Sequence, residues 1–492
     1  MKVHKNKIKK RNNRKRIYSL LKDFIAENKV MFFLTVSVMF LCWISFIYWD
    51  MQSIASHSIS AWDLLFKGDF LKFYSNSISL TVDGLSTPAN YNMTLYIFFI
   101  IWNFPIWLIG EIFNFDPVES SICMTYSKLL LIVFLVYSAY WIYKICRILK
   151  ISEKNSLFSA FFYITSAAVL SAVLVIGQSD VIVVTFTLIA VYKYLKNSKF
   201  YPLWFSLAIS MKFYAVFIFI PLLLLREKRI LRIILNTAIS FSITILCKLP
   251  FIGDSEGMLE VNTFTGYMID KLFANTVPLI TGNLPIVIVF WVIISIICWL
   301  KPEDDFETAN KYSIYIIFVT YMGVFLGFDF YPYWLLHLMP YFPIIIMLNF
   351  KNINKNLTIE CVGFCSIIFS MMMRNLYSVC YDLTNISKSG LAHFGGRVDD
   401  LKVQLYYTED MVERSNNLIT AYNLERYSPW FSAVFVGCMI MLLYMNRPST
   451  WSKKIDFNCL NKTYFRTRVC VNLLICCIPL LFYGLSIILS AL

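Results

Sequence analysis

One apolar run near the N-terminus predicts that this chain is a membrane protein. Residues 30–47 are almost wholly apolar and long enough to cross the hydrocarbon core of a bilayer. The segment before them, 2–16, is densely basic, and such a flank is retained in the cytoplasm. Because no small-residue cleavage site follows, we expect a retained span and not a signal peptide. The first span therefore runs outward and delivers Asp50 to the opposite membrane surface.

The composition agrees with a chain that crosses the membrane many times. Of its 492 residues, 58% are hydrophobic and only 15% are charged, which predicts an all-α polytopic membrane protein. The net charge of +14 lies mostly in short loops that we place in the cytoplasm, so we expect membrane lipids and no nucleic acid as partners. The thirteen cysteines show no metal spacing, and most lie inside apolar runs.

The apolar runs predict thirteen spans, with the N-terminus inside and the C-terminus outside. We interpret 92–113 as a re-entrant or interfacial helix on the outer face, because a full crossing would place Lys144 and Arg147 outside. The predicted spans are 30–47, 128–143, 156–175, 181–196, 201–213, 214–225, 231–249, 281–300, 309–328, 332–349, 357–373, 429–446 and 471–491.

Three regions follow from this topology. The first is a basic cytoplasmic arm, 1–29, and the second is a transmembrane module, 30–350, which includes the outer loop 50–127. The third is a C-terminal transmembrane region, 351–492, with a polar outer loop, 374–428. We find no internal repeat, which disfavours an inverted-repeat transporter.

Two carboxylates are predicted at the outer membrane boundary. Asp50 opens an amphipathic helix, 50–65, and His57 lies seven residues later on nearly the same face. Asp180 lies in the short outer hairpin 177–180. The plainer alternatives are a solvated surface helix for Asp50 and His57, and a helix cap for Asp180.

Cationic and aromatic residues are predicted on the same face. Lys212 interrupts an apolar stretch and offers a point charge for a phosphate, although a lysine that snorkels to the interface would look the same. Tyr331, Tyr333 and His337 open a span from the outer side, where an aromatic belt is the alternative. Arg374 is a further outer cation. Together with the two carboxylates, these groups predict a site for a phosphate-bearing lipid with acid–base chemistry beside it.

The order of these motifs resembles the GT-C glycosyltransferases, which use polyprenyl-phosphate-linked sugars. The resemblance covers about residues 30–350, and its most specific element is the Gln-x-Asp hairpin followed by a Lys-aromatic pair. The matching motifs are Asp50 after the first span, Trp-Asp-Leu-Leu-Phe-Lys-Gly-Asp at 62–69, Asn-Tyr-Asn at 90–92, Gly-Gln-Ser-Asp at 177–180, Ser-Met-Lys-Phe-Tyr at 210–214 and Phe-Tyr-Pro-Tyr-Trp at 330–334.

The resemblance implies a GT-C-like fold with outer juxtamembrane helices in the first extracytoplasmic loop. It also implies that Asp50 is the catalytic base, that Asp180 positions substrate or a divalent cation, and that Lys212 contacts the donor phosphate. We expect further substrate contacts from His57, Tyr331, Tyr333, His337 and Arg374. The chain departs from the family where a proline-rich loop entry is replaced by Asn90-Tyr91-Asn92, and beyond about residue 350 it matches no family pattern.

The expected function is therefore inverting transfer of a hexosyl or pentosyl group to an extracytoplasmic acceptor, which is a glycan, a lipid or a protein. The expected place is the cell membrane, in the biosynthesis of a cell-envelope glycan. Three alternatives remain open: a flippase or transporter, a non-catalytic assembly protein, and a polysaccharide ligase or polymerase. The last would use outer arginines, of which Arg374, Arg397, Arg414 and Arg426 are candidates.

Overall fold

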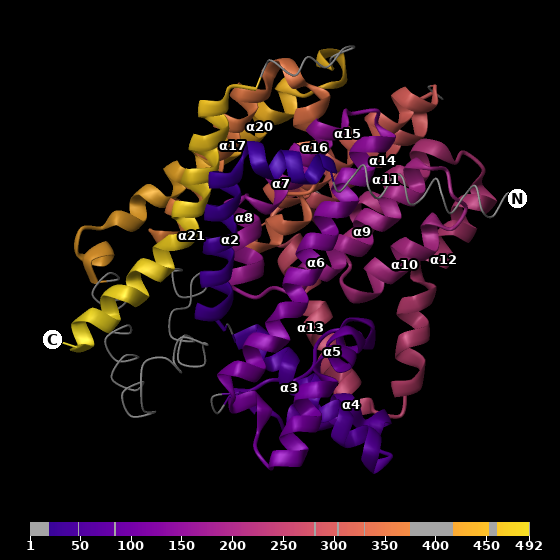
Figure 1. Ribbon diagram of the computed structural model, residues 1–492. Helices are drawn as coiled ribbons and strands as arrows, with labels where there is room; N and C mark the ends of the chain where they lie inside the picture. The colour runs from indigo at the N-terminus through magenta and orange to yellow at the C-terminus, as the bar shows by residue number, and fades with distance from the viewer. Residues whose placement is uncertain are drawn as a thin grey trace, which may run out of the picture.

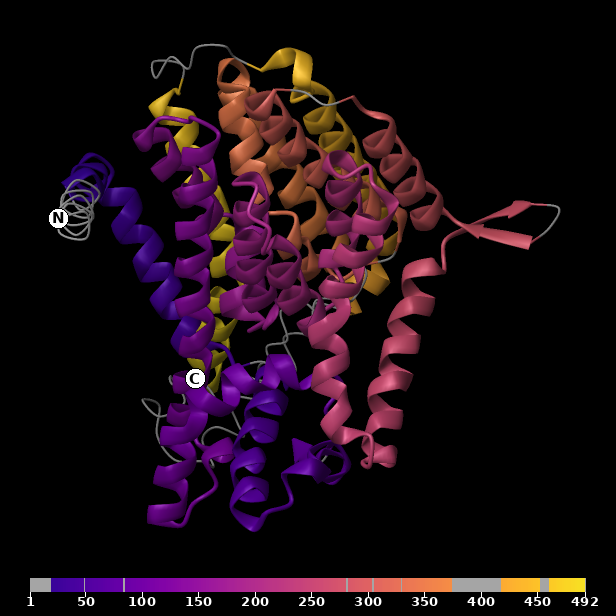
Figure 2. The same cartoon turned by 90° about the vertical axis from the view of Figure 1, so that its right-hand side faces the viewer.

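The protein is almost entirely helical. The computed structural model describes residues 19–47, 49–82, 85–279, 282–302, 305–328, 330–373, 417–451 and 460–491. Within these ranges the strands form two antiparallel hairpins, β1 (Thr81–Val82) with β2 (Leu85–Ser86), and β3 (Thr276–Leu279) with β4 (Gly282–Pro285). Figure 2 shows the β3–β4 hairpin projecting from the helical body.

Most of the helices form one large bundle, which occupies the upper part of Figure 1. Its members are α2 (Lys29–Ser45), α6 (Ser121–Ile148), α7 (Glu153–Ile164), α8 (Ala167–Leu170), η3 (Ser171–Val175), α9 (Asp180–Leu195), α10 (Tyr201–Met211), α11 (Ala215–Arg226), α14 (Ile286–Leu300), α15 (Phe306–Gly327), α16 (Tyr341–Leu348), α17 (Ile353–Met372), α20 (Ser428–Met445) and α21 (Lys462–Ala491).

A second, smaller group of helices lies at one end of the bundle. It consists of α3 (Trp49–Lys67), α4 (Phe73–Ile78), α5 (Met93–Phe113) and α13 (Ser255–Phe273), at the bottom of Figure 1. A long helix, α12 (Ile230–Lys248), connects the bundle to this group. Figure 2 shows α12 and α13 side by side and joined at their lower ends. Short 3₁₀ turns complete the description: η1 (Phe70–Lys72), η2 (Pro117–Glu119), η4 (Leu249–Phe251), η5 (Pro332–His337), η6 (Phe350–Asn352), η9 (Leu424–Tyr427) and η10 (Pro448–Thr450).

The α9 helix lies at the centre of the bundle. It is apolar on all faces, and side chains such as Val181, Leu188 and Val191 are fully buried, as expected for a helix packed on every side. Its neighbours include α6, α10 and η5. Because Asp180 is the first residue of α9, its carboxylate is carried into the interior of the protein.

The helix before α9 is broken, and α21 satisfies the backbone groups that the break exposes. α7 and the α8–η3 segment meet at a 53° bend. On one face of α21, Arg468 donates to the Phe162 carbonyl at 3.0 Å and Asn472 donates to the Thr165 carbonyl at 3.1 Å. Arg468 also forms a buried ion pair with Glu360 of α17. A break at membrane depth is stable only when its backbone groups find such partners.

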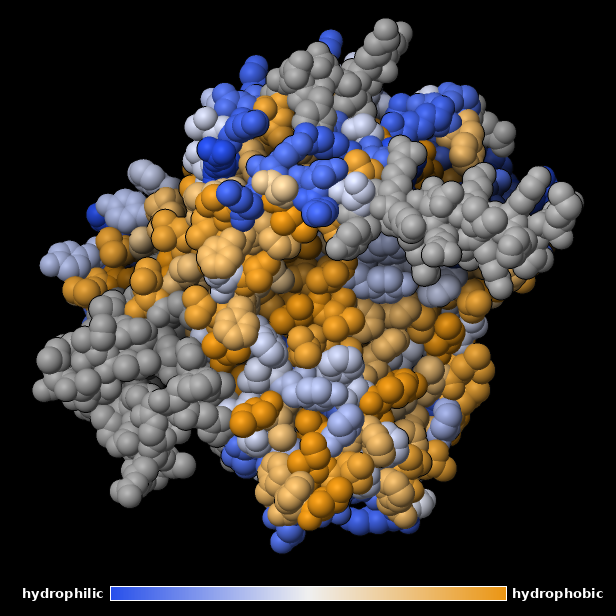
Figure 3. All heavy atoms as spheres, in the orientation of Figure 1, coloured by the Kyte–Doolittle hydropathy of each residue, from blue (hydrophilic) through white to orange (hydrophobic). Residues whose placement is uncertain are grey.

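The apolar helices indicate a membrane-embedded protein. Five described helices are long and apolar enough to cross a bilayer: Met93–Phe113, Ser121–Ile148, Ile230–Phe251, Phe306–Gly327 and Leu424–Met445. The number rises to seven if the bent pairs Ser19–Glu27 with Lys29–Ser45 and Glu153–Ile164 with Ala167–Val175 each count as one span. Figure 3 shows hydrophobic side chains across the middle of the visible face and hydrophilic ones gathered at the top.

The predicted count of thirteen spans is wrong. Several apolar runs that we counted as spans fold as short helices, because polar or proline residues interrupt them. The predicted spans 201–213 and 214–225 are α10 and α11, of 11 and 12 residues, and 332–349 contains the 8-residue α16. A 12-residue helix is about 18 Å long and falls well short of a hydrocarbon core of about 30 Å.

The helix predicted at 92–113 is present as α5, with its bounds displaced by one residue at the N-terminal end. It has the length and composition of a span, yet it lies among α3, α4 and α13 and not within the large bundle (Figure 1). The interfacial placement stays a prediction. The predicted outer loop 374–428 lies outside the described residues as far as residue 416.

Candidate active site

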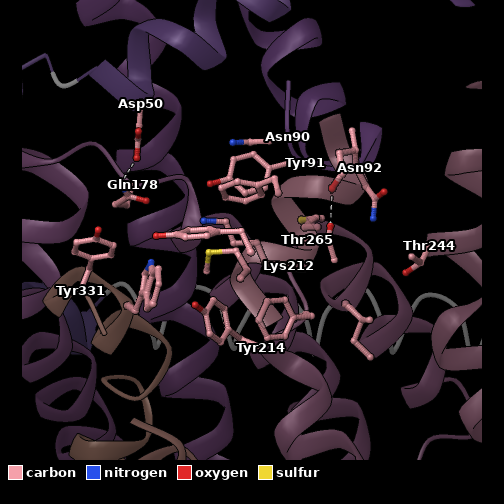
Figure 4. A pocket seen from close by; sticks show the side chains of 18 of the residues that line it. Asp50, Asn90, Tyr91, Asn92, Gln178, Lys212, Tyr214, Thr244, Thr265 and Tyr331 are labelled. Carbon is pink, nitrogen blue, oxygen red and sulfur yellow. Dashed lines mark hydrogen bonds between the residues drawn. The ribbon is translucent and has the colours of Figure 1, made fainter. Parts of the chain in front are cut away.

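A cavity of about 420 Å³ lies where the small group of helices meets the large bundle (Figure 4). Its wall comes from α3, α10, α12, α13, η5, the junction between α10 and α11, and the loops that precede α5 and α9. The lining residues are Asp50, Asn90, Tyr91, Asn92, Gln178, Ile209, Met211, Lys212, Phe213, Tyr214, Phe241, Thr244, Lys248, Val261, Phe264, Thr265, Tyr267, Met268, Tyr331, Tyr333 and Trp334.

Asp50 faces this cavity and is held by Gln178. The Gln178 amide donates to Asp50 Oδ2 at 2.6 Å, across 128 residues of sequence. Gly177 favours the turn that places Gln178 here, because its φ is +71°, a backbone conformation that residues with a side chain rarely adopt. A residue with a Cβ would strain the turn.

Burial sets the basicity of Asp50. Removal from water raises the pKa of its carboxyl group, while the hydrogen bond from Gln178 and the charge of Lys212 act in the opposite direction. A carboxylate with a raised pKa is a stronger base than one on the surface, and this is the adjustment that general bases require.

Lys212 lies at a break between two helices. The backbone is extended at Lys212, where α10 ends and before α11 begins, so its side chain is directed by the junction and not by a helix face. Its ammonium forms an ion pair with Asp180 and lies 4.6 Å from the centre of the Tyr91 ring. The Lys212 side chain is 8% exposed, and the exposed part faces the cavity.

Asp180 lies behind Lys212 and also contacts His337. The distance from Asp180 Oδ2 to His337 Nε2 is 3.3 Å, and both side chains are buried. A buried carboxylate is better tolerated when a cation pairs with it, as Lys212 does here. The ammonium of Lys212 carries three donors, and Asp180 fixes its position while leaving donors for a ligand in the cavity.

Aromatic rings of the η5 region form part of the wall, and a second cation, Lys271, packs on them. The rings of Tyr331 and Tyr333 are parallel, with centroids 5.5 Å apart. The ammonium of Lys271, from α13, lies 3.9 Å from the centre of the Tyr331 ring and 5.4 Å from that of Trp334. These contacts tie α13 to η5 at the rim of the cavity.

One flank of the cavity is apolar. Phe241 of α12 and Val261, Phe264 and Met268 of α13 line it. The outer surface of α12 carries exposed apolar side chains such as Leu235 and Leu246. The cavity thus joins a charged end to an apolar flank beside a helix whose surface is suited to lipid.

The structure brings most of the predicted site residues together. Asp50, Lys212, Tyr331 and Tyr333 line the cavity, and Asp180 and His337 lie directly behind Lys212. Arg374 lies outside the described residues.

His57 lies apart from the cavity wall. It is buried in α3, and its Nε2 bonds to the carbonyl of Thr87. Burial lowers the pKa of His57 to about 4, so the ring is neutral at physiological pH. This position gives no support to the substrate contact that we predicted for His57.

Sequence reasoning missed the wall formed by α13. The spans predicted at 231–249 and 281–300 leave only an outer loop between them, whereas 19 residues of this segment form a helix that contributes five residues to the lining. The available signal was the helical spacing of Val261, Thr265 and Met268. Tyr91 was noted as part of a motif, but its place beside the Lys212 ammonium could not be read from the sequence.

The arrangement around Asp180 does not fit a divalent cation. Its two carboxylate oxygens face the ammonium of Lys212 and the ring of His337. A magnesium ion prefers oxygen ligands and would be repelled by that ammonium. Among the described residues, no three or more histidine, cysteine or acidic side chains gather as a metal site.

No family model matches the chain, and no curated protein matches its sequence. What the fold and the site define is a class: a helical, membrane-embedded protein with a cavity that has a charged end and an apolar flank.

Proposed function

We propose that this protein is a membrane glycosyltransferase that moves a sugar from a polyprenyl-phosphate donor to an acceptor hydroxyl. One observation carries the proposal: the Asp50 carboxylate and the Lys212 ammonium face the same cavity, which also has an apolar flank. A base, a phosphate-binding cation and a lipid-compatible wall are the three groups that this reaction needs.

The donor would lie with its phosphate at Lys212 and its hydrocarbon chain along α12 and α13. The Lys212 ammonium is a good partner for a phosphate, and Asp180 holds it in place. As the sugar–phosphate bond breaks, negative charge accumulates on the phosphate. A fixed ammonium in a cavity of low polarity stabilises that charge more than water does.

The acceptor would approach from the side of Asp50. The Asp50 carboxylate takes the proton of the acceptor hydroxyl, the hydroxyl oxygen forms a bond to the anomeric carbon, and the polyprenyl phosphate leaves with the bonding electrons. Attack opposite the leaving phosphate inverts the anomeric centre. A positioned base contributes about 10² to 10⁴ in rate.

The first test replaces Asp50. Asp50→Asn keeps the size of the side chain but removes the base, so transfer should fall by about 10² or more while the donor lipid remains bound. Lipid that copurifies with the protein is identified by mass spectrometry, and transfer is measured with the lipid-linked sugar so identified.

Asp63→Asn is the matched control. Asp63 lies on the same helix, α3, but accepts a hydrogen bond from Trp107 at 2.7 Å and does not line the cavity. Its substitution should leave transfer within about twofold, because it touches no group of the reaction. Near-normal transfer by folded Asp50→Asn protein would refute the proposed base and favour an arginine-dependent ligase.

A further inference from the structure

Lys128 is a fully buried cation that the proposed chemistry does not use. It lies two turns into α6 with no exposed surface. Its ammonium donates to the backbone carbonyls of Cys42 at 3.0 Å, Trp43 at 3.4 Å, Phe46 and Leu174. A buried ammonium is costly unless its donors are satisfied, and here backbone carbonyls satisfy them.

These carbonyls belong to the ends of two separate helices. Cys42, Trp43 and Phe46 lie at the C-terminal end of α2, and Leu174 lies in the last turn of η3. The C-terminal end of a helix carries unpaired carbonyls and partial negative charge, which a cation stabilises. Lys128 therefore caps two helix ends with one charge.

Each capped helix end is followed, a few residues later in the sequence, by one of the two residues that bond to each other, Asp50 or Gln178. Four residues beyond Phe46 is Asp50, and four residues beyond Leu174 is Gln178, with Asp180 two residues later. The Gln178 amide then bonds to Asp50 at 2.6 Å. A second contact, from the Trp43 indole to the Thr125 carbonyl at 3.0 Å, joins α2 to α6. That contact involves α2 and α6 alone, whereas Lys128 bonds to both α2 and η3.

We propose that Lys128 is a positioning residue that sets the distance between Asp50 and the Gln178–Asp180 hairpin. It touches no cavity surface and acts through the two helix ends. The inference deepens the proposed function and rests on it for its catalytic meaning, because the distance matters to transfer only if Asp50 is the base. The distance itself can be measured without any transfer assay.

The experiment measures this distance by cross-linking. Asp50→Cys and Gln178→Cys are introduced together in a chain whose native cysteines are replaced, and disulfide formation is followed with a mild oxidant. Lys128→Met, which keeps the length of the side chain but removes the charge and the donors, is then added. We expect the rate of cross-linking to fall by about tenfold or more, since reactions between positioned groups are sensitive to displacements of about 1 Å.

Lys228→Met is the control for loss of a capping lysine, although Lys228 is only partly buried. Lys228 donates to the carbonyls of Leu224 at 2.8 Å, Cys298 at 3.0 Å and Trp299 at 2.7 Å, at the end of α11 that is remote from Lys212. The carbonyls that it caps belong to the ends of α11 and α14, and not to the segments that carry Asp50 and Gln178. The Asp50→Cys, Gln178→Cys cross-link should form at its normal rate in this variant.

A second cysteine pair distinguishes local displacement from general unfolding. Ser370 and Ser432 lie 2.6 Å apart at their hydroxyl oxygens, on α17 and α20, and neither helix is one that Lys128 caps. Cysteines at these two positions should cross-link equally well with and without Lys128→Met. Loss of both cross-links would mean that Lys128 serves the fold as a whole, which would overturn the proposal, as would an unchanged Asp50–Gln178 cross-link.

The outcome also separates this inference from the proposed function. If Lys128→Met slows the cross-link selectively but Asp50→Asn leaves transfer intact, the positioning role stands and Asp50 is refuted as the base. If the cross-link is slowed selectively and Asp50 is also the base, Lys128→Met in the otherwise native chain should lower kcat of transfer by about tenfold, while donor lipid still copurifies. Adding Lys128→Met to Asp50→Asn should then cause no further loss, because the two residues act on one step.

Discussion

At the scale of single residues, the site depends on a buried ion pair, in which the carboxylate of Asp180 holds the ammonium of Lys212 in place. Lys212 faces the cavity, and Asp180 and His337 lie behind it in the protein interior. Removing one partner of a buried ion pair costs about 3–5 kcal/mol, because the other is left as an uncompensated charge. Lys212 therefore serves both stability and ligand binding, and a substitution must separate the two.

We predict that Lys212→Met destabilises the protein and that adding Asp180→Asn restores much of the lost stability. Asp180→Asn removes the charge that Lys212→Met leaves unpaired, at nearly constant volume. Thermal unfolding in detergent measures this recovery. The double variant should still fail to retain phosphate-bearing lipid in the mass-spectrometric assay, because the ammonium is absent. Normal lipid retention by the folded double variant would refute Lys212 as the phosphate contact.

At the scale of the elements, α13 completes the cavity because it docks against α4. Asp254, just before α13, accepts hydrogen bonds from the backbone amides of Tyr74 and Ser75, both at 3.0 Å. Gly257 makes the contact close, since a Cβ there would lie 2.3 Å from the Ser75 nitrogen. The polar loops at one end of the molecule thus place Val261, Thr265 and Met268 along the cavity.

A pair of glycine substitutions on α13 tests this docking. Gly257→Ala should lower stability by about 1–3 kcal/mol, because the added methyl group collides with the backbone of α4. Gly266→Ala, where a Cβ meets nothing within 4 Å, should instead stabilise the helix by up to about 1 kcal/mol. Thermal unfolding and the rate of proteolysis within 249–275 measure both effects. Equal responses of the two variants would show that α13 is not held by this contact.

At the scale of the whole molecule, the charged end of the cavity and the small group of helices should face outward. The loops that carry Lys196, Lys199 and Arg229 are basic, and such loops are retained in the cytoplasm. Lys72 belongs to the small group of helices, which the predicted topology places on the outer face of the membrane. The ion pair between Lys72 and Asp69 at 2.8 Å is exposed and contributes little to stability, so Lys72 can be replaced without disturbing the fold.

Single-cysteine labelling tests this orientation. In a chain whose native cysteines are replaced, Lys72→Cys should react with a membrane-impermeant thiol reagent added to intact cells. Lys199→Cys should react only after the membrane is opened. The reverse pattern would place the cavity on the cytoplasmic side and would exclude an extracytoplasmic acceptor.

The sequence by itself determined the class of the protein and several local elements. Long apolar runs require a membrane, and local spacing predicted the helix that carries Asp50, the break at Lys212 and the tight turn before Asp180. Such features depend on neighbours within a few residues, so periodicity and turn residues reveal them. Short apolar runs were misleading, because an apolar composition alone does not distinguish a membrane span from a short buried helix. The predicted number of spans was wrong for that reason.

Only the tertiary structure decided which of these local elements meet. The hydrogen bond between Gln178 and Asp50 joins residues that are 128 positions apart, and Asp180 and His337 are further apart still. Lys128 bonds to one helix end that precedes it in the sequence and to another that follows it. No local pattern encodes such contacts, since they arise when helices pack and buried polar groups must find partners. The wall formed by α13 depends in the same way on a glycine that can touch α4. Packing, and not periodicity, therefore created the cavity.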